Sequence, residues 1–583
     1  MENNLPKNLK DFFQKGPVLK NQYETDFLLK NYLKRVIPAD ILQRIEPDLI
    51  NFGSRVVTDV YEMGLDAEDH EPELTQFDPW GKRIDEIKTS KGWTDLHHVA
   101  ASEGLVGIGY EREFAEFSRI YQFAKLYLYT ASSAIQACPL AMTDAAAKLI
   151  EIFKPRNLLE TTFQRLIGRD ENTAWTSGQW MTERIGGSDV GNTETIAKKL
   201  GDYYRLYGFK WFTSAATSEI AFTLARIEDD DGKTIERSRG LSLFYLETHD
   251  EQGNLNNIQI ERLKDKLGTR ALPTAELQLN GTKAYLVGEQ GRGVKNITHM
   301  LNMTRLYNSV SAISYLRRIL ALLKDYNTKR YVFGKLLADQ PLHIETVADL
   351  ETNLHGLFHL TFFTVSLLGK DELNKASEDE IKLLRLLTPI TKLYTGKIAI
   401  QSISEAVECF GGNGYMEDTG IPKILRDAQV LTIWEGTTNV LSLDMLRAME
   451  KDQAFEPLIK FISKSIQNID PQFESQKKKL HDRLLVLKSF MIDLTTKERE
   501  YSEASARNLS FSLAEVIISL LLLEHGIWEK NNKNTEKALQ IALRWIERPF
   551  TQLKKTDEKH RKSASLIISD EESEKEVKTI VAD

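Results

Sequence analysis

A β-rich block from about residue 176 to 288 interrupts a chain whose other long segments have helical periodicity. Segments such as 203–207 and 241–246 are short and alternating, as is typical of strands. Asn280-Gly281 predicts a tight two-residue hairpin turn. Because helical segments lie on both sides of this block, we predict a mainly α fold with a central β domain.

The flanking segments place apolar residues three to four positions apart, which is the spacing of a helix face. This pattern holds in residues 114–128, 143–153, 306–326, 343–368, 377–396 and 399–409. A nearly continuous apolar run at 510–526 predicts a buried helix. The stretch at 75–95 contains Asp-Pro-Trp-Gly and predicts an irregular connection.

A chain of 583 residues is too long for one hydrophobic core, so we expect several domains. We predict an N-terminal helical domain at 1–175, a middle β domain at 176–288, a helical bundle domain at 289–450, an additional helical domain at 451–550 and a mobile charged tail at 551–583.

Composition narrows the class of protein. A net charge of −8 and a pI near 5.9 argue against a dedicated nucleic-acid binder. Cys138 and Cys409 lie too far apart for a metal motif or a disulfide framework, and adjacent His97 and His98 point apart on a helix, so we expect no metal. The sequence has no secretory or transit pattern and no apolar run of the ~20 residues that cross a bilayer. We therefore expect a cytoplasmic protein without a membrane span.

Residues 433–439 contain the candidate for chemistry. Glu435 stands between Trp434 and Gly436, and a carboxylate beside apolar walls has a raised proton affinity that suits a general base. The glycine allows a substrate or another backbone to come close. A glutamate next to an aromatic residue is also common on a solvated surface, so the motif gains its meaning from other segments.

The order of helices, β domain, helices and Trp-Glu-Gly-Thr resembles the acyl-CoA dehydrogenase family over roughly residues 100–450. The first supporting segment is 181–190, Met-Thr-Glu-Arg-Ile-Gly-Gly-Ser-Asp-Val, which in the family wraps the flavin and the thioester end of the substrate. The second is 208–214, Gly-Phe-Lys-Trp-Phe-Thr-Ser. The resemblance implies that Trp211 packs against the isoalloxazine and that Thr213 lies near its reactive edge.

Two later segments carry the resemblance further. Arg330 and Phe333 match residues that lie against the flavin diphosphate and adenine of a neighbouring subunit, and Gln340 follows one residue closer than in well-known members. The alternative for this segment is a helix end capped by Gly334. Residues 410–415, Phe-Gly-Gly-Asn-Gly-Tyr, match the glycines that approach the adenine half of the cofactor across a subunit boundary.

Further matches at 261–270, 303–308 and 387–389, together with about 130 extra residues after 450, resemble the AidB-like branch. Glu408 stands where most family members carry glutamine. The implied fold is acyl-CoA dehydrogenase-like. It has an N-terminal helical domain, a middle β-barrel-like domain and a C-terminal four-helix bundle, here followed by an extra C-terminal helical domain.

The resemblance implies an oxidoreductase of fatty acid metabolism that dehydrogenates an acyl-CoA thioester between its α and β carbons. Glu435 would remove the pro-R α-proton while a hydride passes to N5 of FAD, and the Glu435 N–H would stabilise the enolate. Threonine at 304 cannot replace this base, although some relatives place theirs there. Implied cofactor residues are Met181, Thr182, Gly187, Ser188, Trp211, Phe212, Thr213, Arg330, Phe333, Gln340, Gly411, Gly412, Thr437 and Asn439. Implied substrate residues are Ser188, Arg305, Glu435 and Gly436.

Other readings remain open from the sequence. A flavin-containing protein that binds or sequesters acyl-CoA with little turnover is the main alternative, since not all AidB-like members are efficient dehydrogenases. DNA association and an acyl-CoA oxidase activity are weaker alternatives. The family further implies an electron-transfer flavoprotein as electron acceptor and a homotetramer.

Overall fold

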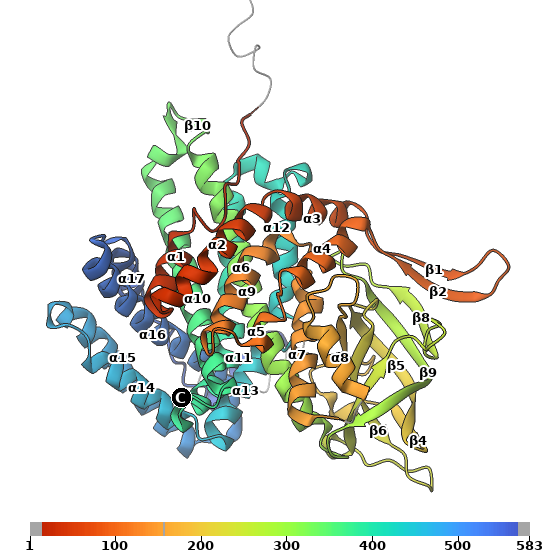
Figure 1. The fold of residues 1–583 in the computed structure, drawn as a ribbon. Coiled ribbons are helices and arrows are strands. Elements are labelled where there is room, and N and C mark those ends of the chain that lie inside the picture. The colour runs from red at the N-terminus through yellow and green to blue at the C-terminus, as the bar shows by residue number, and fades with distance from the viewer. Residues whose placement is uncertain (1–13, 156–157, 570–583) are drawn as a thin grey trace, which may run out of the picture. The chain divides into compact units, whose positions relative to one another are not determined.

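The computed structural model describes residues 14–155 and 158–569 (Figure 1). The chain divides into two compact units. The first comprises Met1–Leu354 and Ile398–Leu431, and the second comprises His355–Lys397 and Thr432–Asp583. Residues of two long helices, α10 (Pro341–Glu372) and α11 (Glu378–Glu408), fall in both units.

The first unit begins with helices whose apolar faces are buried. Their bounds are α1 (Phe27–Val36), α2 (Ala39–Arg55), α3 (Asp59–Asp69), α4 (Lys91–Ser102), α5 (Ile108–Glu111), α6 (Phe117–Tyr129), α7 (Ala137–Phe153) and α8 (Leu158–Ile167). Both α6 and α7 are almost wholly buried and pack against α9 (Gly293–Asn327). The helices predicted near 114–128 and 143–153 correspond to α6 and α7.

A hairpin stands where the sequence predicted an irregular connection. Strands β1 (Glu73–Phe77) and β2 (Arg83–Lys88) pair antiparallel and form the long ribbon labelled in Figure 1. The Asp78 carboxylate accepts the backbone N–H groups of Trp80 and Lys82 at 2.8 and 2.9 Å, which closes the turn. The Gln76 amide donates to the carbonyl of Ile260 at 2.9 Å and so ties the ribbon to a strand far along the chain.

The middle of the first unit is a closed β-barrel. The described strands are β3 (Ser177–Trp180), β4 (Ile196–Leu200), β5 (Tyr203–Ser214), β6 (Ile220–Ile227), β7 (Leu241–Glu247), β8 (Ile258–Leu263) and β9 (Thr274–Val287). Pairings run from β6 to β4, β5, β9 and β7 and return to β6, while β3 extends β6 and β8 extends β9. The five strands of the closed ring therefore each have a strand partner on both sides, whereas β3 and β8 each pair with one strand. The predicted barrel-like domain is confirmed.

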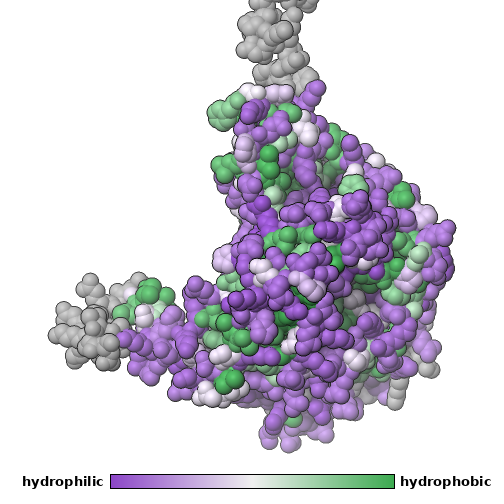
Figure 2. All heavy atoms as spheres, turned by 90° about the vertical axis from the view of Figure 1, so that its left-hand side faces the viewer, coloured by the Kyte–Doolittle hydropathy of each residue, from purple (hydrophilic) through white to green (hydrophobic). Residues whose placement is uncertain are grey.

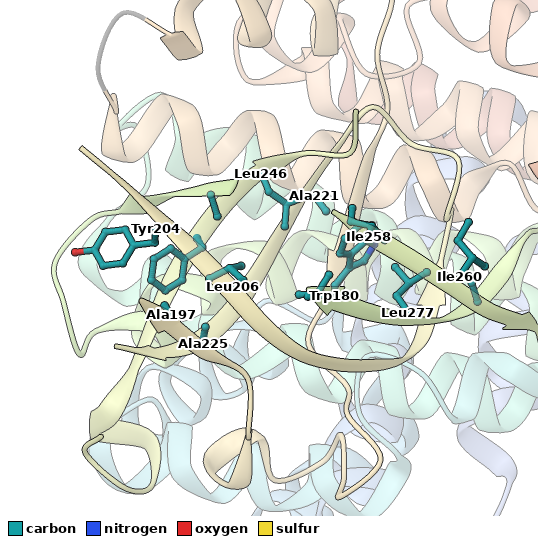
Figure 3. Packing of buried hydrophobic residues seen from close by; sticks show 14 residues of the cluster. Trp180, Ala197, Tyr204, Leu206, Ala221, Ala225, Leu246, Ile258, Ile260 and Leu277 are labelled. Atoms are coloured by element: carbon teal, nitrogen blue, oxygen red, sulfur yellow. The ribbon is translucent and has the colours of Figure 1, made fainter. Parts of the chain in front are cut away.

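The barrel is filled by side chains that alternate along its strands (Figure 3). Tyr204 and Leu206 of β5 point inward with Leu277 and Leu279 of β9, and Trp180 closes the cluster from β3. Full burial of one such aliphatic side chain contributes about 1.5–3 kcal/mol. The core therefore holds rigid the strand that carries Trp211.

The predicted turn at Asn280-Gly281 is wrong, because both residues lie inside β9. Along the pair with β5, Tyr207 faces Asn280 and Leu206 faces Thr282, so Gly281 has no partner of its own. Its φ of +88° is the left-handed conformation that a glycine bulge requires. The Asn-Gly pair bends a long strand here and does not reverse the chain.

Helices return after the barrel. The first unit gains α9 and α12 (Ile421–Gln429), with short 3₁₀ turns between α11 and α12 that include η6 (Gly411–Tyr415). The sequence predicted separate helices at 377–396 and 399–409, but α11 runs through Pro389 and ends at Glu408 as one helix. The cost of the missing Pro389 N–H is small beside the packing of a long, largely buried helix.

The second unit is helical throughout its described length beyond α11. It contains α13 (Thr438–Lys451), α14 (Phe455–Gln467), α15 (Glu474–Thr496), α16 (Arg499–Lys533), α17 (Lys537–Glu547) and α18 (Glu558–Ile568). Helix α16 is long and apolar enough to cross a membrane, yet 78% of its most apolar window is buried inside the protein. It is the buried helix predicted from residues 510–526.

One part of the predicted tail is ordered as a helix. Helix α18 lies within 551–583, and the Asp557 side chain caps its first turn by accepting the N–H of His560 at 2.9 Å. Residues 570–583 of the predicted tail lie outside the described residues. On the face shown in Figure 2, hydrophilic residues predominate and the hydrophobic ones form separate small groups. Such a surface is that of an ordinary globular protein.

Candidate active site

The first candidate segment is a tight turn that leaves β3. Met181 and Thr182 are half-buried, whereas Gly187 and Ser188 are exposed. The turn closes on itself, since Glu183 N–H donates to the Gly186 carbonyl at 3.2 Å and the Gly186 N–H donates back at 3.1 Å. A Cβ at Gly187 would lie 2.7 Å from the Thr182 hydroxyl oxygen, so only glycine fits without a shift. The turn thus exposes backbone amides and the Ser188 hydroxyl.

A buried ion pair that the sequence analysis missed fixes this turn. Glu183 accepts from Lys210 Nζ at 2.8 Å and from the Thr195 hydroxyl at 2.6 Å, and Lys210 also donates to the Leu224 carbonyl at 3.0 Å. Burial opposes ionisation of Glu183, but the charge and hydrogen bonds of Lys210 hold its pKa below the usual range. The signal available in the sequence was a lysine at an inward position of an alternating strand. Through this pair the turn is locked to β5.

Strand β5 brings the second segment beside the first. The backbone N–H of Trp211 donates to the Thr182 carbonyl at 2.9 Å, so the two segments are directly joined. Lys264 Nζ lies 3.5 Å from the centroid of the Trp211 ring and is itself paired with Glu276. Phe212, next along the strand, is exposed. Half-buried Trp211 is thus held in place by both its backbone and its ring.

Thr213 carries the clearest sign of a ligand site. Its side chain is 1% exposed, and within the described part of the chain its hydroxyl has no hydrogen-bond partner. An unpaired buried hydroxyl costs about 1–3 kcal/mol relative to one that is hydrogen-bonded. A polar ligand atom at this position would remove that cost.

The third segment is a small hairpin that presents Phe333. Strands β10 (Tyr331–Val332) and β11 (Lys335–Leu336) are joined by Phe333 and Gly334, whose φ angles of +48° and +78° indicate a type I′ turn. Gly334 is therefore a turn residue, and the alternative of a helix cap is wrong because α9 already ends at Asn327. Phe333 is 100% exposed, and Arg330 at the base of the hairpin is half-buried. Gln340 braces the hairpin, since its amide donates to the Val332 carbonyl at 2.8 Å.

The fourth segment packs against the end of α9. The ring of Tyr326, at the end of α9, is 5.2 Å from that of Phe410, and its hydroxyl accepts from the Asn413 amide at 3.2 Å. Gly411 and Gly412 are exposed, and a Cβ on either would meet nothing within 4 Å. These two glycines are open to an approaching molecule. The first and second segments are thus joined directly, whereas the third and fourth both contact Tyr326, whose carbonyl accepts the Arg330 N–H at 3.0 Å.

Arg305 and Thr304 are buried on α9. The Thr304 hydroxyl donates within its own helix to the Met300 carbonyl at 3.2 Å, and Arg305 Nη1 lies 3.5 Å from Asn302 Oδ1. Two positions on, Tyr307 donates to Asp144 at 2.8 Å. Asp144 also accepts from Arg119 of α6 at 2.8 Å, in a buried network that the sequence analysis missed. This network locks α6, α7 and α9 around the Arg305 region.

Glu435 lies at the start of the second unit's own segment, on the approach to α13. Its φ is +58° and that of Gly436 is +103°, so two successive residues adopt the left-handed region. For glutamate this conformation costs about 1–2 kcal/mol and is found mainly at turns and functional sites. Buried Lys392 donates to the Gly436 carbonyl at 2.6 Å, and Thr437 caps α13 by accepting the Val440 N–H at 3.4 Å.

These contacts determine the backbone direction at Glu435. Glu435 and Trp434 are half-buried, whereas Thr437 and Asn439 are exposed. The geometry holds one carboxylate at a strained, glycine-flanked corner in front of a helix N-terminus. Such a carboxylate can accept a proton from a substrate, and its neighbouring N–H groups can stabilise negative charge.

Comparison with known families gives matches along most of the chain. The matching family models are "Adaptive response protein AidB N-terminal domain" at residues 17–170, "Acyl-CoA dehydrogenase, middle domain" at 178–282, "Acyl-CoA dehydrogenase, C-terminal domain" at 291–450 and "Acyl-CoA dehydrogenase 11 C-terminal domain-like" at 453–572.

Individual relatives agree with these matches. The chain is 43% identical to acyl-CoA dehydrogenase family member 11 of Caenorhabditis elegans, over 93% of this chain and 90% of that protein. It is 29% identical to the putative acyl-CoA dehydrogenase AidB of Escherichia coli, over 75% of this chain and 80% of the other. The crystal structure of C. elegans ACDH-11 in complex with C11-CoA superposes with a TM-score of 0.93 and 41% identity, covering 96% of this chain and 97% of that one. The chain therefore belongs to the acyl-CoA dehydrogenase family, in its AidB-like branch.

Proposed function

We propose that the protein is an FAD-dependent dehydrogenase that oxidises a fatty acyl-CoA thioester between its α and β carbons. The observation that carries this proposal is the buried hydroxyl of Thr213, which has no hydrogen-bond partner in residues 14–155 and 158–569 and stands on the strand of Trp211, which is bonded to the turn at 181–188. The acyl-CoA part of the proposal is supported by the complex of C. elegans ACDH-11 with C11-CoA.

The first unit offers donors that fit a flavin. The Thr213 hydroxyl, the Ser188 hydroxyl and the exposed amides near Gly187 can donate to ring and phosphate oxygens, and the ring of Trp211 offers an aromatic face. Met181, Thr182 and Phe212 complete this cofactor group, to which we also assign Thr437 and Asn439. When bound, FAD would supply the acceptor for the substrate hydride.

The exposed hairpin and glycine turn fit the outer half of a cofactor that belongs to another copy of the chain. Phe333 is exposed at the tip of a rigid hairpin, Arg330 offers a planar guanidinium for phosphate, and Gly411 and Gly412 leave room for close approach. Because the Gln340 amide donates to the Val332 carbonyl, we assign Gln340 mainly to the support of this hairpin. We propose a homotetramer in which these residues serve a neighbouring subunit.

The chemistry assigned to this chain is the removal of a weakly acidic proton. Glu435 takes the α-proton of the thioester, and its backbone N–H stabilises the developing enolate oxygen. The loss of one such donor would raise the barrier by about 3–4 kcal/mol. Lys392 keeps the Gly436 carbonyl engaged, so the peptide units around Glu435 are already oriented. Arg305 and Gly436 are the further substrate residues, and an electron-transfer flavoprotein is the proposed acceptor of the electrons.

The proposed location is the cytoplasm. Cys138 and Cys409 form no disulfide with each other, which fits a reducing compartment.

The test is anaerobic titration of the flavin-loaded protein with acyl-CoA. Wild-type protein should lose its flavin absorbance, whereas Glu435→Gln should bind flavin and acyl-CoA without this bleaching. Full bleaching by the variant would refute the role of Glu435. Binding without bleaching by the wild type would instead favour a protein that sequesters acyl-CoA.

A further inference from the structure

The first unit contains a cavity whose lining includes none of the cofactor and substrate residues assigned above. It has a volume of about 430 Å³ and lies between α3, the segment after α6, α9 and residues 410–424, with residues 14–17 also in its wall. Its polar lining includes Tyr61, Ser132, Arg318 and Lys423. The volume is within the range of small-molecule sites. We call it the Arg318 cavity.

Arg318 is a buried cation for which the described residues supply no anionic partner. Its residue is 4% exposed, its Nη2 donates to the Ser132 hydroxyl, and its guanidinium lies 5.6 Å from the centroid of the Tyr61 ring. Within residues 14–155 and 158–569, no carboxylate forms an ion pair with it. Burial is the main reason that the pKa of Arg318 is lowered to about 10.

Arg317, the preceding residue of α9, is a buried arginine whose charge is paired with a carboxylate. Arg317 is also buried, but its Nε lies 2.7 Å from the Asp26 carboxylate and its pKa is raised despite burial. A charged group in the protein interior is stabilised only when it is paired and hydrogen-bonded. Arg318 has a hydrogen bond to Ser132, but no carboxylate of the described residues is paired with it.

The carboxylates near the cavity are already engaged elsewhere. Lys423 Nζ lies 3.1 Å from Glu68 Oε1 and also contacts Asp427, and Asp427 accepts the Thr269 N–H at 2.6 Å. Burial raises the pKa of Glu68 against the opposing effect of Lys423. Both carboxylates therefore contact Lys423, and neither forms an ion pair with Arg318.

The rest of the wall is largely apolar. Leu65, Leu322, Phe410, Ile421 and Ile424 line the cavity together with the guanidinium. A purely inorganic anion would leave these side chains in contact with water, whereas an aliphatic acid would cover them. We propose that the Arg318 cavity binds the carboxylate group of an aliphatic acid, with Arg318 as the pairing residue.

Two sources of this carboxylate are compatible with the wall. One is a free fatty acid, and the other is the distal carboxylate of an acyl-CoA made from a dicarboxylic acid. Arg305 and Arg318 lie on the same helix and are separated by about 20 Å along its axis at 1.5 Å per residue. The second source rests on the proposed function, because it requires the thioester end to lie near Arg305.

The experiment titrates flavin-loaded full-length protein with dodecanoate and, as a neutral probe of the same length, with dodecanol. Dodecanoate should bind wild-type protein at least about tenfold more tightly than dodecanol, because about one charge-assisted hydrogen bond contributes this difference in affinity. Arg318→Met should remove this difference. The control Lys324→Met, on the same helix and paired with Glu351, should preserve it. Equal binding of acid and alcohol by wild-type protein would overturn the proposal even if the variant failed to fold.

The two sources are separated by turnover of dodecanoyl-CoA and dodecanedioyl-CoA. If the carboxylate belongs to the substrate, Arg318→Met should raise KM for the dicarboxylic ester about tenfold and leave the monocarboxylic ester unchanged. If the carboxylate belongs to a free acid, Arg318→Met should change KM equally for both esters and should abolish the binding of dodecanoate. Absence of turnover with every ester would refute the proposed function and leave the dodecanoate titration as the measure of the cavity.

Discussion

Replacement of Thr213 by valine tests whether the orphan hydroxyl marks the cofactor site. Valine keeps the shape of threonine and replaces a hydroxyl that is 1% exposed and unpaired within the described chain. Because no hydrogen bond is lost in the flavin-free protein, the substitution removes only a desolvation cost. We expect the flavin-free variant to be more stable by about 1 kcal/mol.

Thr223 provides a matched control in the same barrel. It is 0% exposed on β6, and its hydroxyl donates to the Trp180 carbonyl. Thr223→Val loses that hydrogen bond and leaves a buried carbonyl poorly satisfied. It should therefore destabilise the flavin-free protein by about 1 kcal/mol, a change of opposite sign at a site of the same chemistry.

The assay combines denaturant unfolding of flavin-free protein with a fluorescence titration of FAD. Thr213→Val should bind FAD about fivefold more weakly, the loss of one hydrogen bond of about 1 kcal/mol, whereas Thr223→Val should bind it normally. The reasoning fails if Thr213→Val is as destabilising as the control, because its hydroxyl would then be bonded in the free protein. It also fails if FAD affinity does not change.

Three further predictions concern the turn, the base and the glycines. Lys210→Met should lower the free energy of unfolding by about 3–5 kcal/mol, because it leaves the buried Glu183 carboxylate without its cationic partner. The pKa of Glu183 is lower in the folded state than its ordinary value of 4.5. The carboxylate therefore contributes to the free energy of unfolding above pH 4.5, and this contribution is lost as the pH falls through the folded-state pKa. The free energy of unfolding of Glu183→Gln should lack this dependence on acidic pH. Glu435→Gly should be about 1 kcal/mol more stable than Glu435→Ala, since φ there is +58°; equal stabilities would contradict the strain. Gly414→Ala places its Cβ 2.1 Å from a backbone carbonyl and should unfold at lower temperature, whereas Gly412→Ala should keep its melting temperature and lose only flavin retention.

Local patterns in the sequence predicted much of the fold. Alternation at 203–207 identified a strand because one side of β5 faces the barrel core, whereas residues 241–246 of β7 are buried on both faces and were identified by their apolar, β-rich composition. The turn at Asn280-Gly281 failed because turn propensity is local, while pairing of both flanks with β5 keeps β9 extended. The hairpin of β1 and β2 was missed because its apolar pair, Leu74 and Ile87, is short and packs against the barrel, and because the hairpin depends on hydrogen bonds to Ile260, far along the chain.

The candidate site was predictable where its signal is contiguous. Glu435 stood out because an aromatic residue and a glycine flank it in the sequence. The pair of Glu183 and Lys210 is separated by 27 positions, and Tyr307 and Asp144 by 163. Charged residues that are distant in sequence carry no sign that they meet, and composition alone assigns them to the surface. Only the folded chain shows that Glu183 and Lys210 fix the turn and that Tyr307 and Asp144 hold α9.

Two features of the folded chain argue for ligand chemistry independently of any relative. The hydroxyl of Thr213, which has no hydrogen-bond partner among the described residues, and the left-handed backbone of Glu435 each cost about 1–2 kcal/mol. A domain is stable by only about 5–15 kcal/mol, so such costs are large. The first cost disappears when a polar ligand atom meets the hydroxyl. The second sets the direction of a carboxylate and of its N–H, and glycine at the same position would be less strained but would supply no carboxylate. Both costs are explained if the chain is built to bind a polar cofactor and to move a proton.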